Sequence, residues 1–149
     1  MENKILGLHH ITAIANNAKI NHDFYTKVLG LRMVKKTVNF DDPNTYHFYY
    51  GNENGAPGTI LTFFPWEGIG KGYTGTGQAT EIGYSVPEGS LDFWANRFKE
   101  NNITIGEKSE RFGEHFLPFQ DPDGLNLSLI VPKQKDNRIC HDSIIHADR

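Results

Sequence analysis

The stretch GLHHITAIA, residues 7–15, places two adjacent histidines in the first strand that the sequence predicts. Residues 5–15 are rich enough in apolar and β-branched side chains for a strand. Because side chains alternate along a strand, His10 and Thr12 should share one face and His9 should lie on the other. Both faces are largely apolar, so the alternation does not say which of them meets solvent.

A helix and three further strands should follow this first strand. Asn16 and Asn17 are candidate N-caps, and Gly30 stands where a glycine commonly ends a helix. Between them one apolar stripe has helical spacing, made of Ile20, Phe24 and Val28. The turn-forming segments 41–44 and 51–58 separate three expected strands, at residues 31–40, 46–50 and 59–64. The predicted order is βαβββ.

The same order returns after the glycine-rich stretch GIGKGYTGTG, residues 68–77, which is too poor in apolar residues for a core segment. Ser90 should cap a helix whose buried stripe is Leu91, Trp94, Ala95 and Phe98. Strands are expected at residues 80–86, 103–105, 115–119 and 125–131. The fragment GAPGTILTFFP of the first half also matches the fragment QDPDGLNLSLIVP at the equivalent place of the second half. The sequence therefore predicts an α+β fold made of two tandem βαβββ modules.

This repeat sets the expected domain organisation. Module one should cover residues 1–66, a glycine-rich connector 67–78 and module two 79–132. Residues 133–149 are polar and show no periodicity, so we expect a tail or linker there.

Charge and cysteine content limit the possible functions. Fifteen Lys and Arg against eighteen Asp and Glu give a net charge of -3 with no basic stripe, so we expect no nucleic-acid partner. No apolar run is long enough to span a bilayer, so we expect no membrane partner. The single cysteine, Cys140, cannot form an intrachain disulfide. It is expected to be an incidental thiol, and the composition favours a cytoplasmic protein.

The repeated modules, with HHITAIA at the start and DPDGLNLSLI at the end, resemble the vicinal oxygen chelate superfamily of glyoxalases, bleomycin-resistance proteins and extradiol dioxygenases. The resemblance covers residues 4–132. Four further segments resemble the first half of dioxygenases that open hydroquinone-type rings: LHHIT, YHFYYGNENGAPGTILTFFPW, SLDFW and RFGEHFLPFQDPDG. The resemblance implies that each module curls its sheet into half a barrel, and that paired modules enclose a metal cleft.

The same resemblance implies a ligand set that this chain leaves incomplete. It places His10 and Glu81 at metal-ligand positions of the two first strands, whereas Thr62 and Ser128 stand at the last-strand positions. A non-haem iron(II) centre needs two histidines and one carboxylate. Ring-cleaving relatives are about twice this length and take the other ligands from their second half. We therefore expect a half-length form that binds Fe(II), another divalent metal or none by itself.

Several other residues are candidates for the cleft. The resemblance suggests a catalytic role for His9, although His9 also fits a packing or interface histidine. Thr12 is a catalytic candidate because it shares the strand face of His10 and would line the cleft with it. His47 and Tyr49 share a strand face and are candidates for substrate binding, as is His115; core packing is the alternative for each. For Glu81, the alternative is a salt bridge to a lysine or arginine.

Three functions remain open. The resemblance implies a ring-cleaving dioxygenase acting on hydroquinone- or catechol-type aromatics. A glyoxalase-like lyase would need a four-ligand set, against which Thr62 and Ser128 count. A metal-free protein that binds a small aromatic molecule is the third. Curled sheets leave open edges, so we expect a homodimer or pairing with a second half-length chain.

Overall fold

The structure is a computed structural model that describes residues 4–5, 7–73 and 75–134. These residues divide into two units, which we call module one, up to Ile69, and module two, from Gly70 onward. The boundary between the units thus lies inside the expected connector, residues 67–78. Cys140 and nearly all of the expected tail lie outside the described residues.

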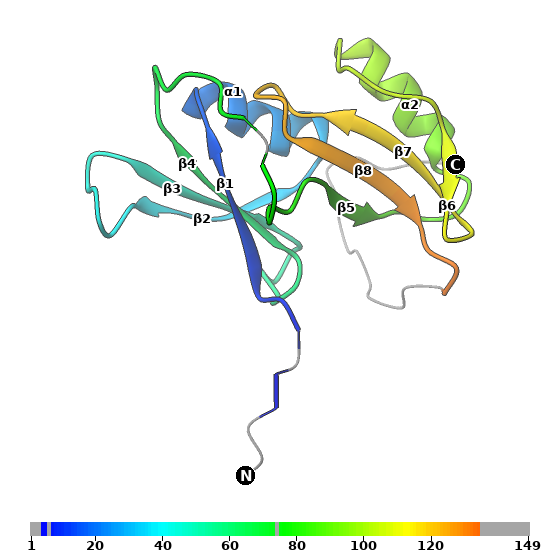
Figure 1. Ribbon diagram of the computed structural model, residues 1–149, viewed down its shortest axis with the longest axis horizontal. Coiled ribbons are helices and arrows are strands. Elements are labelled where there is room, and N and C mark those ends of the chain that lie inside the picture. Colours follow the sequence, from blue (N-terminus) through cyan, green and yellow to red (C-terminus); the bar gives the residue numbers. More distant parts are fainter. Residues whose placement is uncertain (1–3, 6, 74, 135–149) are drawn as a thin grey trace. The chain divides into compact units, whose positions relative to one another are not determined.

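Module one contains a sheet of four strands in the order β1-β4-β3-β2. Strand β1 (His10–Ala15) runs parallel to β4 (Ile60–Pro65). Strand β3 (Tyr46–Gly51) lies between β4 and β2 (Arg32–Val38) and is antiparallel to both (Figure 1). The helical segment of this module connects β1 to β2, so the observed order is βαβββ.

Module two repeats this topology in a second four-stranded sheet, of order β5-β8-β7-β6. Its parallel pair is β5 (Ile82–Ser85) and β8 (Asn126–Val131). Strand β7 (Glu114–Gln120) pairs antiparallel with β8 and with the edge strand β6 (Ser109–Arg111). The shared strand order confirms the α+β fold of two tandem βαβββ modules.

Two of the predicted strands differ from the structure. Strand β1 begins at His10 rather than at residue 5, because its partner β4 begins opposite at Ile60. The predicted strand at residues 103–105 is wrong, since Ile105 forms only an isolated bridge to Phe119. The fourth strand is β6, which is exposed along its whole length and so carries no apolar alternation that a sequence pattern could reveal.

The first helical segment begins as predicted and buries Phe24 of the predicted stripe, but not Ile20. The side chain of Asn17 accepts a hydrogen bond from the backbone N–H of Ile20, which confirms the N-cap of α1 (Ala18–Asp23). The chain continues as the π-helix η1 (Phe24–Val28), in which bonds span five residues and rotate the following side chains. Ile20 is exposed, and the predicted stripe is therefore wrong at this position.

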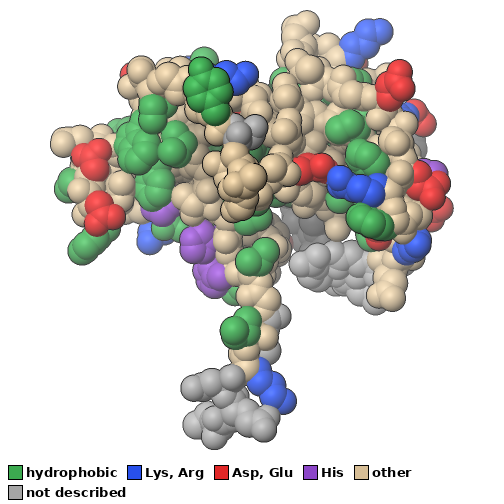
Figure 2. Space-filling view, in the orientation of Figure 1, with side chains coloured by type: hydrophobic (Ala, Val, Ile, Leu, Met, Phe, Trp, Pro, Cys, Tyr) green, Lys and Arg blue, Asp and Glu red, His purple; other side chains and the backbone are tan. Residues whose placement is uncertain are grey.

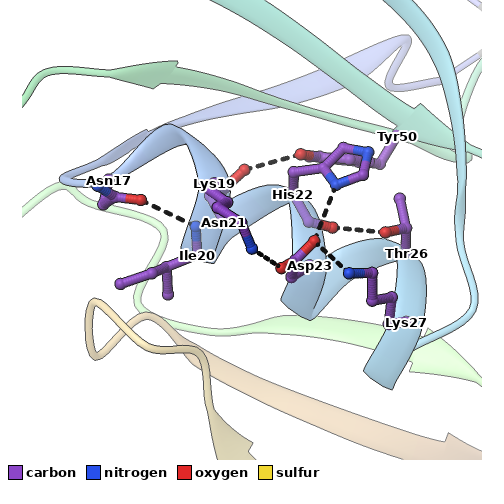
Figure 3. Close-up of polar contacts among 9 residues, drawn as sticks. All are labelled: Asn17, Lys19, Ile20, Asn21, His22, Asp23, Thr26, Lys27 and Tyr50. Carbon is purple, nitrogen blue, oxygen red and sulfur yellow. Dashed lines mark hydrogen bonds and ion pairs between the residues drawn. The ribbon is translucent and has the colours of Figure 1, made fainter.

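A buried polar contact joins this helix to the sheet of module one (Figure 3). Asn21 is 1% exposed, and its Oδ1 accepts a hydrogen bond of 2.9 Å from the hydroxyl of Tyr50. Aromatic rings complete the packing, since Tyr25 lies 5.1 Å from Tyr50 and 4.7 Å from Phe63 between ring centroids. The core of module one therefore lies between the helix and the sheet face that carries Tyr50 and Phe63.

In module two, helix α2 (Leu91–Glu100) packs on the sheet through Phe98, whose ring lies 4.6 Å from that of Phe119. Leu91 and Phe98 are buried, whereas Trp94 and Ala95 are half-buried. Ser90 stands at the N-cap position, but its side chain makes no capping hydrogen bond. Its hydroxyl donates instead to the carbonyl of Pro87, at 2.6 Å.

None of the helices formed by the described residues has the length and apolar character needed to cross a membrane.

Candidate functional site

One face of the sheet in module one is turned away from the helix and carries the predicted site residues of this module. His10 and Thr12 are exposed, whereas Ala15 is buried on the helix side. Figure 2 shows a group of histidine side chains on module one near the base of the N-terminal segment. This structure answers the question that alternation left open, because the face shared by His10 and Thr12 is the open one. We call it the open face of module one.

His9 and His10 contact each other although they are adjacent in sequence. Their Nδ1 atoms are 3.0 Å apart and their rings meet edge to face, with centroids 5.2 Å apart. His9 precedes β1, so strand alternation does not carry its side chain to the opposite side. Both imidazoles are exposed, and the arrangement offers two adjacent ring nitrogens to solvent.

A row of cross-strand neighbours runs over all four strands of the open face. Thr12 pairs with Thr62, Thr62 with Tyr49, and Tyr49 with Lys35 on the edge strand. The buried hydroxyl of Thr62 donates to the hydroxyl of Thr12, at 2.9 Å. Since this bond uses an acceptor position of Thr12, the hydrogen of the Thr12 hydroxyl remains available for a ligand beside His10.

Aromatic rings form a continuous strip beside this row. The ring of His47 lies 4.3 Å from Tyr49 and 4.1 Å from Phe64, and Phe64 stacks on Trp66 at 6.0 Å. The hydroxyl of Tyr49 and Nδ1 of His47 are also hydrogen-bonded, at 3.1 Å. We call Trp66, Phe64, His47 and Tyr49 the aromatic strip. Its flat apolar rings can stack against a planar ligand.

The surroundings of His47 disfavour its protonated form. Burial is the main cause that lowers the pKa of His47 below its ordinary value, and the charges of His10 and Lys35 lower it further. Its Nε2 is buried and has no hydrogen-bond partner among the described residues. The strand register places His10, His47 and Lys35 on the same side of the sheet, since His10 has the parity of Thr12 and His47 that of Tyr49, which pairs with Lys35.

In module two, Glu81 holds the position that corresponds to His10, since Thr12 and Thr62 pair in one module as Gly83 and Ser128 pair in the other. The carboxylate of Glu81 accepts two hydrogen bonds from Arg111, at 2.8 and 3.1 Å. This ion pair lowers the pKa of Glu81 below its ordinary value. The arginine comes from β6, which the sequence pattern missed.

His115 lies on a different face from Glu81. Along β7 it has the parity of Leu117 and Phe119, both of which are buried. It lines a shallow pocket on the helix side with Leu91. The structure therefore does not bring His115 together with the other candidates of module two.

The residues present do not fit a complete metal centre. Within residues 4–5, 7–73 and 75–134, no group of three or more His, Cys, Asp or Glu side chains is arranged to hold a metal ion. In module one, His10 and His9 offer imidazole nitrogens, but the nearby last-strand position carries Thr62. In module two, Arg111 already occupies both oxygens of Glu81. A facial set of two histidines and one carboxylate needs ligands from elsewhere.

Two tandem βαβββ modules with curled sheets, and an exposed histidine on the first strand, define a two-module protein of the glyoxalase type. The chain belongs to the Glyoxalase/Bleomycin resistance protein/Dioxygenase superfamily, whose family model matches residues 7–129. This membership confirms the resemblance that the sequence motifs indicated.

Two curated relatives are much longer than this chain. The Bacillus subtilis (strain 168) protein named "Putative ring-cleaving dioxygenase MhqO" is 53% identical over 130 residues, which are 87% of this chain and 41% of that protein. The "Chlorohydroquinone/hydroquinone 1,2-dioxygenase" of Sphingobium indicum is 40% identical over 130 residues, or 85% of this chain and 40% of that protein. The chain therefore spans about two fifths of the length of these relatives.

Solved structures agree with this fold. A crystal structure from Bacillus subtilis titled "putative dioxygenase" is 51% identical, with a TM-score of 0.83, over 89% of this chain and 43% of that one. A glyoxalase/bleomycin resistance protein/dioxygenase domain from Frankia sp. EAN1pec is 16% identical, with a TM-score of 0.71, over 87% of this chain and 100% of that one. The second similarity shows the fold alone.

Proposed function

We propose that this chain is the two-module part of a ring-cleaving dioxygenase acting on hydroquinone- or catechol-type aromatics. The observation that carries the proposal is the open face of module one, where an exposed His10 lies on the same side as an aromatic strip. The similarity to a relative named for hydroquinone dioxygenation, at 40% identity, supports the substrate class. This similarity supports the class of substrate and no particular substrate, because the chain covers 40% of that protein.

Within this proposal, the open face binds and orients the substrate. The rings of Tyr49 and His47 stack against the aromatic diol, and the Thr12 hydroxyl donates to one of its oxygens. His9, exposed and in contact with His10, takes up a proton from the diol. His10 supplies one ligand of an iron(II) site. The other ligands come from outside the described residues.

The proposed completion of the site requires a partner. A second copy of this chain, or a second half-length chain, would bring further modules against the open face. The edge position of β1, with Leu8 and Ile14 exposed beside it, supports pairing on physical grounds. A cytoplasmic location belongs to the same proposal, because the sequence contains a single cysteine.

A metal-free protein that binds aromatic molecules is the second candidate. It is favoured by the combination of an aromatic strip and a ligand set that the described residues leave incomplete. A glyoxalase-like lyase is less well supported, because the hydroxyls of Thr62 and Ser128 are buried at the two last-strand ligand positions.

A chimera tests the proposed dioxygenase role. This chain replaces the matched 130 residues of the Sphingobium indicum enzyme, and oxygen uptake with hydroquinone and bound iron per chain are measured. We expect the chimera to consume oxygen, and His10→Ala to lose both oxygen uptake and iron. His115→Gln, on the helix-side face, is the matched control and should keep both. A His10→Ala chimera that retains iron and activity would exclude the role proposed for His10.

The same experiment separates the two candidates. A chimera that binds hydroquinone but neither iron nor oxygen favours the metal-free binding protein. Light scattering of the purified chain tests pairing, and a mass that stays that of one chain at all concentrations contradicts the homodimer.

A further inference from the structure

Two consecutive lysines of β2 lie on opposite faces of the sheet in module one. A register shift between Met33 and Lys35 marks a β-bulge just before them. Lys35 then pairs with Tyr49 on the open face, and Lys36 pairs with Phe48 on the helix-side face. Each ammonium lies over an aromatic ring, Lys35 at 5.3 Å from the centroid of Tyr49 and Lys36 at 4.3 Å from that of Tyr46.

Lys35 has no carboxylate partner on its face. The four strands β1, β2, β3 and β4 contain no Asp or Glu. Among the described residues, Lys35 forms no ion pair. Arg32, a cation of the same strand whose partner Gly51 has the parity of Tyr49, donates to the backbone carbonyl of Glu53, at 3.5 Å. The open face therefore presents an uncompensated positive charge beside the aromatic strip.

The position of Lys35 suits a substituent on a bound ring. It stands at the opposite end of the cross-strand row from Thr12, three strand spacings or about 14 Å away between backbones. Tyr49 and Thr62 lie between these two ends. A single aromatic ring stacked on Tyr49 can thus direct one hydroxyl toward Thr12 and His10 and another ring substituent toward the ammonium.

We propose that Lys35 is the counter-ion for an anionic substituent on the aromatic ligand, so that carboxylated ring diols bind in preference to neutral ones. This inference rests on the proposed function, since it assigns the substrate class to the same open face. The anionic oxygen that Lys35 attracts has two possible sources, a carboxylate on the ring or the ionised hydroxyl of the diol itself. We assign the partner of Lys35 to the carboxylate.

The test uses the full chain and three ligands: 2,5-dihydroxybenzoate, its methyl ester and hydroquinone. Dissociation constants are measured by NMR titration of the chain, with Lys35→Met as the variant and Lys36→Met as its matched control. The acid should bind roughly threefold more tightly than the ester, the size of one partly exposed ion pair. Lys35→Met should remove this preference, Lys36→Met should keep it, and added salt should reduce it.

Three results would overturn the proposal. If the wild-type chain binds hydroquinone but has equal dissociation constants for 2,5-dihydroxybenzoate and its methyl ester, this inference fails while the proposed function stands. If Lys35→Met weakens all three ligands equally, the ionised hydroxyl is the partner of Lys35. If none of the three ligands binds and no resonance of the open face moves, the proposed function fails together with the inference.

Discussion

Arg111 holds the carboxylate of Glu81 through two hydrogen bonds, at the position of module two that His10 occupies in module one. At equivalent positions, module one thus carries an exposed imidazole and module two an ion pair. The two modules share a topology and differ in chemistry. The proposed ligand-binding role belongs to module one. In module two, the ion pair is expected to contribute to stability.

Glu81→Gln should destabilise module two modestly at neutral pH. The ion pair is partly exposed, so about 0.5 kcal/mol of unfolding free energy is expected to be lost. The folded-state pKa of Glu81 lies below its ordinary value, so this contribution is present above the unfolded-state pKa and disappears as the pH falls through the folded-state pKa. Urea unfolding at about pH 7 and about pH 3 measures it. Glu110→Gln, at an exposed carboxyl of β6 next to Arg111 in sequence, is the control and should leave the free energy of unfolding nearly unchanged.

Tyr50→Phe should cost about 1 to 2 kcal/mol, because it leaves the buried Oδ1 of Asn21 without its donor. Asn21→Leu should also destabilise, since the Tyr50 hydroxyl then lacks its acceptor. The double variant should cost less than the sum, because both polar partners are removed together. Urea unfolding of the two single variants and the double variant gives the coupling, and strict additivity would show that the hydrogen bond contributes nothing.

His47 should titrate at a lower pH than an exposed histidine. Burial is the largest cause of this pKa shift, so Phe64→Ala, which uncovers the ring, should raise the His47 pKa most. Lys35→Met removes one repelling charge and should raise it less, whereas Lys36→Met on the other face should leave it unchanged. NMR titration of the imidazole protons measures each change. Because the folded-state pKa is lowered, protonation of His47 should destabilise module one as the pH falls.

Phe112→Asn should stabilise module two by about 1 kcal/mol, since phenylalanine is strained at positive φ and asparagine tolerates this region. Phe112 has φ 57° at the turn between β6 and β7 and is 86% exposed, so little packing is lost. The comparison is Phe40→Asn, at a residue that is 97% exposed and has no positive φ. Thermal unfolding should show a higher midpoint for Phe112→Asn and no gain for Phe40→Asn.

Much of the site could be anticipated from the spacing of residues along single strands. Alternation placed Thr12 with His10, and Tyr49 with His47, before any pairing of strands was known. Arg111 and Lys35 escaped this reasoning for a shared reason. Both lie on edge strands, where side chains meet solvent: β6 carries no apolar alternation, and in β2, whose strand was predicted, a bulge interrupts the alternation just before Lys35.

The sequence by itself determined the repeated βαβββ order, because glycine-rich turns, caps and apolar periodicity act over a few residues and recur in both halves. It also placed an imidazole and a carboxylate at equivalent positions of the two repeats. Only the tertiary structure decided that His10 stands on an open face while Glu81 is held by Arg111. Exposure and ion pairing depend on cross-strand neighbours that are distant in sequence: Glu81 and Arg111 are 30 residues apart.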